Sequence, residues 1–362
     1  MISLAGIAPA GDDVLFMTGA TGALGSEALR RLLHLEPGLR ALVLVRDPRA
    51  WQARTVGMGG LDAGRVRPVV GDIRQPDLGL SAQDRRAVIR STTLVLHAAA
   101  DTTFSRSEAD ATAVNLDGTA HLLQLAEACR ELRRFGFVST AFVTGRRTGR
   151  IPEGPIANVP GWVNPYEESK HRAEELVRAV RPDALVVRPS TVVWDRTRGV
   201  IPQRNAAHHA LRLLRRGFVP LLPGRSDTPV DLITSDYVAE GIARLMLSEA
   251  SRGSTVHLCA GDGAVALGEL LRLAWVSFRR DPAWRARGLP EPRLVDLPTY
   301  RSFERSVAVG GDFRLRKTVG ALSHFILQLS FPKHFTTDHA RAALGCPPPR
   351  VVDYLPSLLR HL

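Results

Sequence analysis

Short apolar runs recur along the first two hundred residues, and each is followed by glycine, small or hydroxyl-bearing residues. We interpret these runs as buried strands. They cover residues 14–17, 41–45, 66–70, 93–96, 135–138 and 184–187. Apolar positions at helical spacing lie between the later runs, and they predict helices over 81–90, 113–130 and 165–180. Continuous apolar strands that alternate with helices indicate a parallel sheet with helices on both of its faces.

The residues that follow the strands are the candidate binding residues, because ligands of such sheets bind at the carboxyl ends of the strands. These clusters lie at 18–25, 71–73, 97–100, 139–140 and 188–190. We expect them to line a single crevice.

The pattern changes beyond about residue 200, where proline and arginine become frequent and helices such as 206–216 are followed by loops. Only 255–258 resembles another core strand, and a helix over 236–249 is expected to pack back onto the sheet. The predicted fold class is therefore α/β: a Rossmann-type, doubly wound parallel sheet with a smaller, mainly helical C-terminal cap over the substrate.

The predicted domain boundaries follow from the same change in pattern. The Rossmann domain is expected to cover residues 12–200, with 228–260 returning to its sheet. Most of the remaining chain, within 201–362, is expected to form the cap.

A glycine-rich turn, Thr18-Gly19-Ala20-Thr21-Gly22-Ala23-Leu24-Gly25, follows the first strand and precedes a helix. In such a turn Gly19 allows the tight bend, Gly22 lets the backbone approach a pyrophosphate, and Gly25 lets the helix sit close to the sheet. The amino end of the helix then faces the negative charge. We therefore predict a dinucleotide site. We also assign to it the residues between the glycines, Thr21, Ala23 and Leu24.

The end of the second strand distinguishes the two nicotinamide dinucleotides. An NAD enzyme usually has an acid there, which accepts from the ribose 2′-hydroxyl. This chain has Arg46, followed by Asp47. A guanidinium can clamp a 2′-phosphate with two hydrogen bonds, so NADPH (NADP) is the predicted cofactor, and Asp47 as a ribose acceptor is the competing interpretation. After the third strand Asp72 can accept from an adenine amino group or cap the following turn, and Ile73 is assigned to the same site.

Tyr166 and Lys170 are the candidate proton donor and its partner. Lysine is rare here, with three among 48 basic residues, and the two residues are four apart, so they share one face of the predicted helix. A nearby ammonium favours tyrosinate, so we expect the phenol pKa to fall from about 10 toward neutrality. Asn164 is expected to cap this helix, with Glu167 completing a capping box. The alternative is an ordinary pair of surface residues.

The glycine turn, a hydroxyl at the end of the fifth strand and the Tyr-x-x-x-Lys motif together resemble the extended short-chain dehydrogenase/reductase superfamily, over roughly residues 14–260. The closer resemblance is to thioester reductases, which include fatty-acyl-CoA reductases and the terminal reductase domains of carboxylic acid reductases and of nonribosomal peptide or polyketide synthases (the male sterility-like group). The segments that carry it are Gly71-Asp72-Ile73, Pro76-Asp77-Leu78-Gly79-Leu80-Ser81, His97-Ala98-Ala99-Ala100 with Phe104, Asn115-Leu116-Asp117-Gly118-Thr119, and Ser139-Thr140-Ala141-Phe142-Val143 with Gly145.

This resemblance implies a reaction and a set of site residues. Counting back from Gly145 places the catalytic hydroxyl at Thr140, which acts with Tyr166 and Lys170. NADPH would deliver hydride to the carbonyl carbon of an acyl thioester, giving an aldehyde that a second hydride could take to an alcohol. The further cofactor-binding residues are Ala98, Ala99, Ala100, Ser139, Tyr166, Lys170 and Pro189.

Two other functions share part of this pattern. An extended short-chain alcohol dehydrogenase or epimerase, acting on a sugar nucleotide, a steroid or another hydroxyl or ketone compound, would use the same catalytic residues. A non-catalytic NADP-binding sensor or scaffold would need the glycine turn but no proton relay, so the presence of Tyr166 and Lys170 counts against it.

Composition limits the environment and the partners. The net charge of +12 comes from scattered residues without a nucleic-acid motif. It either reflects compositional drift or steers an anionic acyl-CoA or acyl carrier protein. The segment 1–10 lacks a basic start and is not expected to be a secretion signal. Cys129, Cys259 and Cys346 are widely spaced, which fits a reducing compartment and no zinc site. We expect a soluble, cytoplasmic protein with no metal and no membrane-spanning segment.

One apolar stripe in the C-terminal part stays open to two interpretations. It consists of Leu322, Phe325, Ile326 and Leu329 at helical spacing. A helix that faces the core is the preferred interpretation. The alternative is contact with a membrane surface or a long acyl chain.

Overall fold

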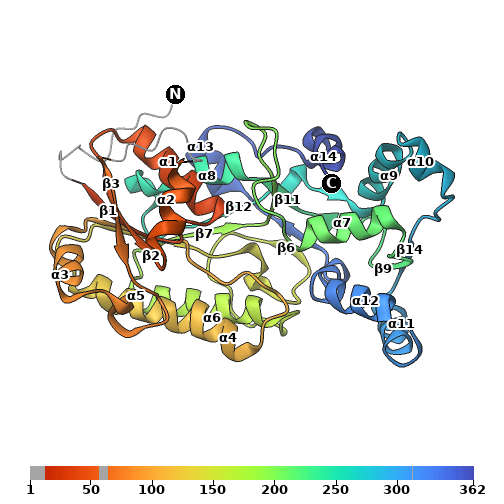
Figure 1. Cartoon of the computed structure of the whole chain (residues 1–362), viewed down its shortest axis with the longest axis horizontal. Helices are drawn as coiled ribbons and strands as arrows, with labels where there is room; N and C mark the ends of the chain where they lie inside the picture. Colours follow the sequence, from red (N-terminus) through yellow and green to blue (C-terminus); the bar gives the residue numbers. More distant parts are fainter. Residues whose placement is uncertain (1–12, 57–63, 312) are drawn as a thin grey trace.

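A computed structural model describes residues 13–56, 64–311 and 313–362 of the chain. The segment 1–10, predicted not to be a secretion signal, lies outside the described residues. A seven-stranded sheet forms the centre of the larger, N-terminal part (Figure 1). Its strands, in spatial order, are β12 (Thr255–Leu258), β7 (Leu185–Pro189), β5 (Arg134–Val138), β4 (Leu94–His97), β1 (Val14–Thr18), β2 (Arg40–Val45) and β3 (Val66–Val70).

All of these strand pairs are parallel. The order reverses at β1, so the loops after β1 and β4 lie at the switch point where such sheets bind ligands. β3 was predicted as a buried strand, but it is an edge strand in which Arg67 and Pro68 are exposed. Proline is tolerated there because an edge strand needs fewer backbone donors.

Two layers of helices cover the sheet because its strands alternate apolar side chains between both faces. On β1, Leu15 and Met17 belong to one hydrophobic core and Phe16 to the other. The first layer contains α1 (Ala23–Leu35), α2 (Pro48–Val56) and α8 (Ser235–Met246). The second layer contains α3 (Ala82–Ser91), α5 (Gly118–Ala128) and α6 (Pro165–Val180), with α4 (Glu108–Thr112) packed on α6.

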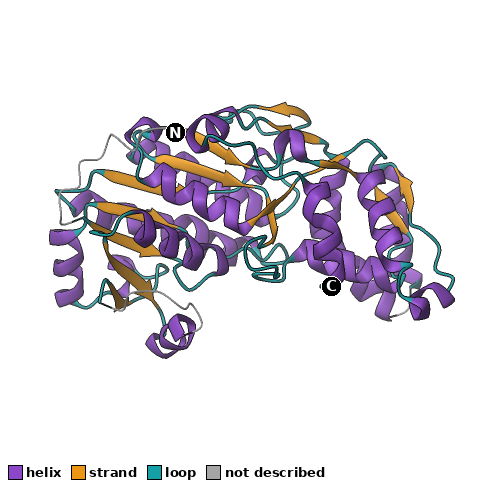
Figure 2. Cartoon of the chain, turned by 90° about the horizontal axis from the view of Figure 1, so that it is seen from above, coloured by secondary structure: helices purple, strands orange, loops and turns teal. Residues whose placement is uncertain are grey.

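The C-terminal part forms a mainly helical cap at one end of the sheet (Figures 1 and 2). Its helices are α7 (Ala206–Arg216), α9 (Leu267–Phe278), α10 (Pro282–Ala286), α11 (Leu297–Gly310), α12 (Phe313–Ile326) and α14 (Val351–Arg360). Helix α13 (Asp338–Leu344) instead packs on β12 and α8 of the N-terminal part (Figure 1). Short strand pairs connect them: β6 (Gly149–Ile151) with β15 (Lys333–Phe335), β8 (Thr191–Trp194) with β11 (Leu232–Thr234), β9 (Leu221–Pro223) with β14 (Arg293–Val295), and β10 (Pro229–Val230) with β13 (Val265–Ala266). The predicted fold class, a doubly wound parallel sheet with a helical cap, is confirmed.

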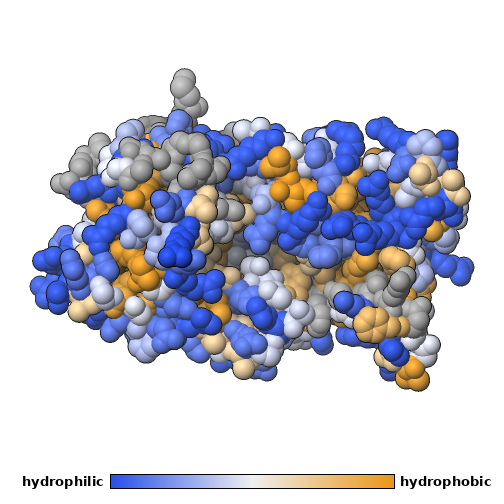
Figure 3. Space-filling model, viewed as in Figure 1, coloured by the Kyte–Doolittle hydropathy of each residue, from blue (hydrophilic) through white to orange (hydrophobic). Residues whose placement is uncertain are grey.

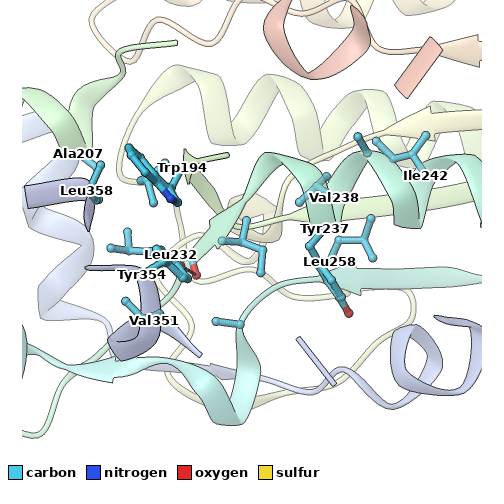
Figure 4. Close-up of a cluster of buried hydrophobic side chains, with 14 of the residues drawn as sticks. Trp194, Ala207, Leu232, Tyr237, Val238, Ile242, Leu258, Val351, Tyr354 and Leu358 are labelled. Carbon is cyan, nitrogen blue, oxygen red and sulfur yellow. Dashed lines mark hydrogen bonds between the residues drawn. The ribbon is translucent and has the colours of Figure 1, made fainter. Parts of the chain in front are cut away.

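A continuous core joins the cap to the sheet. Side chains of α8, β8, β11 and α14 pack together, and the Tyr354 hydroxyl donates to the Leu232 carbonyl at 2.8 Å (Figure 4). On the face seen in Figure 3, hydrophobic side chains form small separate groups among hydrophilic ones. Val309 and Phe313, at the corner between α11 and α12, are 88% and 70% exposed. Within the described ranges, no helix is both long and apolar enough to cross a membrane.

Candidate active site

The glycine turn after β1 forms a cradle that has no room for side chains. Gly19 has φ +78°, and a Cβ there would lie 2.5 Å from the carbonyl carbon of Ala98. A Cβ on Gly25 would overlap the carbonyl oxygen of Gly19. The Gly22 N–H donates to that same oxygen at 3.0 Å, and helix α1 begins directly afterwards. Since Thr21 and Gly22 are exposed and Ala23 and Leu24 half-buried, this backbone fits a pyrophosphate at a helix amino end.

A buried histidine holds the loop after β4 against this turn. His97 Nδ1 is hydrogen-bonded to the Thr18 hydroxyl at 2.7 Å, and Nε2 to the Thr119 hydroxyl at 3.0 Å. The Thr18 oxygen also accepts from the Ala99 N–H at 3.2 Å. Burial, with a smaller contribution from the charge of Lys170, lowers the His97 pKa to about 3. His97 is therefore neutral, and it fixes the half-buried Ala98–Ala100 segment beside Gly19.

Arg46 and Asp72 follow the adjacent strands β2 and β3. The Arg46 side chain is exposed. The carboxylate of the neighbouring Asp47 accepts from the Arg49 N–H at 2.8 Å and so serves the start of α2. This contact gives Asp47 a structural role and weakens its competing interpretation as a ribose acceptor.

Asp72 fulfils the capping role that the sequence left open. Its carboxylate accepts from the Arg74 N–H at 3.0 Å and from the Arg74 side chain at 2.6 Å. The hydrogen bond from Arg74, together with the charges of Arg74 and Arg46, holds the pKa of Asp72 below its usual value. Ile73 is buried against Gly118 and α5, so its side chain is a packing element.

Helix α6 begins at a fixed position, which places Tyr166 in its first turn. Asn164 caps it by accepting from the Glu167 N–H at 3.1 Å, with Pro165 at the first helical position. The Glu167 carboxylate accepts from the Val163 N–H at 3.1 Å and from the Asn164 side-chain amide at 3.0 Å. Two side chains therefore hold the helix start from both directions.

The predicted reaction centre is brought together at the end of β5. The Thr140 side chain lies close enough to the Tyr166 phenol to lower its pKa. Lys170 lies one turn further along α6, and its Nζ donates to the Val138 carbonyl at 2.8 Å and lies 4.0 Å from the centroid of the Phe137 ring. All three side chains of the predicted triad are buried. They are distant in sequence and adjacent in space.

The expected direction of the Tyr166 pKa was wrong for this structure. Burial raises the phenol pKa to about 12, and the nearby Thr140 side chain offsets this only in part. Burial also lowers the Lys170 pKa to about 7, although Glu174 favours its charge. A lysine ammonium in water would be fully charged at neutral pH and would favour tyrosinate. In the low-dielectric interior both groups prefer their neutral forms, so Tyr166 is a protonated donor at neutral pH.

Ser139, assigned to the cofactor site, has its hydroxyl engaged elsewhere. It donates to the Glu174 carboxylate at 2.9 Å. Arg188 pairs with that carboxylate through two hydrogen bonds, one of 3.0 Å, and it is fully buried. The Ser139 hydroxyl is therefore engaged with the Glu174–Arg188 ion pair. Pro189 is buried at the end of β7 beside Leu258.

Asn115, which the sequence indicates only as part of the 115–119 motif, connects α6 to the loop after β4 through hydrogen bonds. It lies in a π-helical turn, η2 (Ala113–Asp117), where a continuous α-helix over 113–130 was predicted. Its amide donates to the Ser169 hydroxyl at 3.0 Å and to the Asp101 carbonyl at 3.1 Å. A π-turn is often found at functional sites, and this one directs the buried Asn115 amide toward Ser169 on α6.

A hydrogen-bonded chain from the cap reaches the residue next to Tyr166, and no pattern in the sequence indicates it. Gln328, in the 3-10 turn η6 (Leu327–Ser330), donates to the Glu167 carboxylate and accepts from Lys333 Nζ at 2.8 Å. Burial raises the Glu167 pKa to about 7 and lowers the Lys333 pKa to about 8. The cap therefore contacts the first turn of α6 through polar side chains.

Folding stability should depend on the charge of Lys170. Between pH 7 and 9 the Lys170 side chain is mostly neutral in the folded protein, whereas it stays protonated in the unfolded chain. The unfolded state therefore binds more protons, and the free energy of unfolding rises with pH. The gain from this one residue is on the order of 1 kcal/mol per pH unit. We expect the unfolding free energy of the cofactor-free protein, measured in urea, to rise relative to that of Lys170→Met between pH 7 and pH 9. A difference that is independent of pH would show that the buried amine stays charged.

The fold and the family matched by the chain define the class of protein: a Rossmann-type, NAD(P)-dependent oxidoreductase. Residues 17–242 match the family described as "Male sterility protein". The chain belongs to this family of NAD(P)-binding reductase domains, and the resemblance predicted from the sequence is confirmed.

Three relatives illustrate what the chain is similar to. It is 28% identical over 271 residues to the nonribosomal peptide synthetase asaC of Aspergillus flavus, covering 67% of this chain and 26% of that protein. It is 28% identical over 294 residues to fatty acyl-CoA reductase 1 of Xenopus laevis, covering 74% of this chain and 55% of that protein. The crystal structure of the terminal R domain from the myxalamid PKS-NRPS biosynthetic pathway superposes with a TM-score of 0.78 at 26% identity, covering 97% of this chain and 90% of that one. The chain thus spans about a quarter and about half of the two curated relatives, and the three likenesses indicate an NAD(P)-dependent oxidoreductase.

Proposed function

We propose that this protein is an NADPH-dependent reductase of an acyl thioester, carried on coenzyme A or on an acyl carrier protein, with Thr140, Tyr166 and Lys170 as its catalytic residues. The observation that carries the proposal is the burial of Thr140, Tyr166 and Lys170 together at the end of β5, with Thr140 near enough to Tyr166 to lower its pKa. The Gly19–Gly25 cradle supports a dinucleotide nearby. The fatty acyl-CoA reductase and peptide synthetase reductase relatives support the thioester.

The residues of the chain have distinct tasks in this reaction. Bound NADPH supplies the hydride. Thr140 and Tyr166 donate hydrogen bonds to the thioester oxygen as negative charge develops on it, and a preorganised pair of donors stabilises that charge. Tyr166 passes its proton to the oxygen, and Lys170, whose pKa of about 7 suits proton transfer near neutral pH, returns a proton to the phenol. The resulting hemithioacetal loses the thiol and leaves an aldehyde.

The proposal has a direct chemical test. Purified protein is incubated with NADPH and, in turn, acyl-CoA thioesters, acyl carrier protein thioesters, aldehydes and ketones, and the products are identified by mass. Thioester-dependent NADPH oxidation with release of free thiol and aldehyde or alcohol supports it. If the protein reduced aldehydes or ketones but none of the thioesters, it would instead belong with the alcohol dehydrogenases.

Arg46 should select NADPH over NADH. It follows β2, it is exposed, and the neighbouring acid Asp47 is used to cap α2. Losing a hydrogen-bonded charge contact to the 2′-phosphate costs about 1.5–3 kcal/mol, or about 10–100-fold. We expect Arg46→Ser to raise the KM for NADPH by that factor and leave the KM for NADH within about twofold. An equal change for both cofactors would assign Arg46 to another task.

A further inference from the structure

The cap contains a cavity of about 60 Å³ whose lining residues are all aliphatic or aromatic. It lies between α7, α9 and α12, and the short strands β9 to β11 complete its walls. Ala210 and Leu211 of α7 face Leu271 of α9 and Phe325 and Ile326 of α12 across it. The apolar stripe on α12 and η6 faces the core, as preferred from the sequence: Leu322 and Ile326 belong to the hydrophobic core, and Phe325 and Leu329 pack against it. All four side chains also line this cavity.

An aromatic path leads from the reaction centre to the cavity. The Phe104 ring lies with its centroid 5.4 Å from that of Tyr166. Phe104 also stacks on Phe325, with centroids 6.3 Å apart and an angle of 6° between the ring planes. Since Phe325 lines the cavity, Phe104 connects the Tyr166 ring to a side chain of the cavity wall.

We infer that this cavity receives the aliphatic acyl chain of the thioester; the inference rests on the proposed function and deepens it. A peptidyl group would bring backbone N–H and C=O groups into a space lined by hydrocarbon, where unpaired polar groups are costly. A hydrocarbon chain gains from the same burial. At about 10–15 Å³ for each water-sized group, the cavity holds about four to six methylene-sized groups. The substrate class is thus a short to medium aliphatic acyl thioester, not a peptidyl one.

Acyl-CoA thioesters of increasing chain length test this assignment. Acetyl, butyryl, hexanoyl, octanoyl and decanoyl thioesters are compared with a glycylglycyl thioester at saturating NADPH. Burial of each methylene should raise kcat/KM by up to about fourfold, with a plateau near six to eight carbons and poor use of the peptidyl substrate. A flat profile, or a peptidyl thioester used as well as hexanoyl, would overturn the assignment.

A variant that fills the cavity links the chain preference to these residues. Ala210 is half-buried on the lining face of α7, whereas the adjacent His209 is exposed. We expect Ala210→Phe to lower kcat/KM for hexanoyl-CoA at least tenfold and for acetyl-CoA less than twofold. The matched control His209→Phe should behave as the unaltered protein. Equal losses on both substrates at an unchanged thermal midpoint would contradict the inference.

A binding measurement separates this inference from the proposed function. Hexanoic acid is titrated calorimetrically into the protein and into Ala210→Phe. Saturable binding that the variant loses, without thioester reduction, would sustain the cavity assignment and refute the proposed function. Thioester reduction without any chain preference and without hexanoate binding would sustain the proposed function and refute the cavity assignment.

Discussion

Tyr166→Phe should lower kcat for thioester reduction by about 10²–10⁴-fold, the usual contribution of a positioned proton donor. The phenol is protonated at neutral pH because burial raises its pKa to about 12, and Thr140 lies close to it. The substitution removes one oxygen and leaves the ring contact with Phe104. The Kd for NADPH should therefore change by less than about twofold. Stopped-flow measurement of NADPH oxidation separates the two quantities.

Tyr237→Phe is the matched control for this experiment. Tyr237 is another buried tyrosine, on α8, and within the described part of the chain its hydroxyl has no hydrogen-bond partner. Its substitution should leave kcat unchanged. Full turnover by Tyr166→Phe with bound NADPH would remove the proposed proton donor.

Gly19→Ala should abolish NADPH binding and strongly destabilise the fold. The new Cβ combines two costs: about 1–3 kcal/mol for backbone strain at φ +78°, and about 1–3 kcal/mol for overpacking against the backbone of Ala98. Displacement of this turn also moves the N–H groups that would face the pyrophosphate. Urea unfolding and fluorescence titration with NADPH measure the two effects.

Gly149→Ala isolates the strain from the clash. Gly149 has φ +83°, yet a Cβ there would have nothing within 4 Å. We expect this control to lose only the strain energy and to keep its NADPH affinity. If both variants lost the same stability and the same affinity, the close contact between Gly19 and Ala98 would not be the reason that position 19 requires a residue without a side chain.

The sheet and the centre of the site could be predicted because local sequence determines them. Buried strands require apolar runs, the Gly19–Gly25 turn requires residues without side chains, and a tyrosine and lysine four apart must share a helix face. The family resemblance, counted back from Gly145, predicts Thr140 as the hydroxyl, and this stays a prediction for which the structure offers a local reason. The Thr140 hydroxyl accepts from the Phe142 N–H, and the turn that follows ends at Gly145 with φ +53°.

The remaining features depend on contacts between distant segments, and no local pattern encodes them. The pKa values of Tyr166 and Lys170 are set by how completely the fold excludes water, which reversed the expected direction. The π-turn at Asn115 follows from its hydrogen bonds to Asp101 and Ser169. The link from Gln328 to Glu167 joins residues that the chain separates by 161 positions.

Transfer of an isotopic label tests the central claim most directly. Hexanoyl-CoA is incubated with NADPH that carries deuterium at the transferable position of nicotinamide C4, and the product is examined by mass spectrometry. The account predicts one deuterium on the former carbonyl carbon of the aldehyde, or two on that of the alcohol, with one free thiol released per thioester consumed. Oxidation of NADPH with the thioester intact, or a product without deuterium, would contradict it.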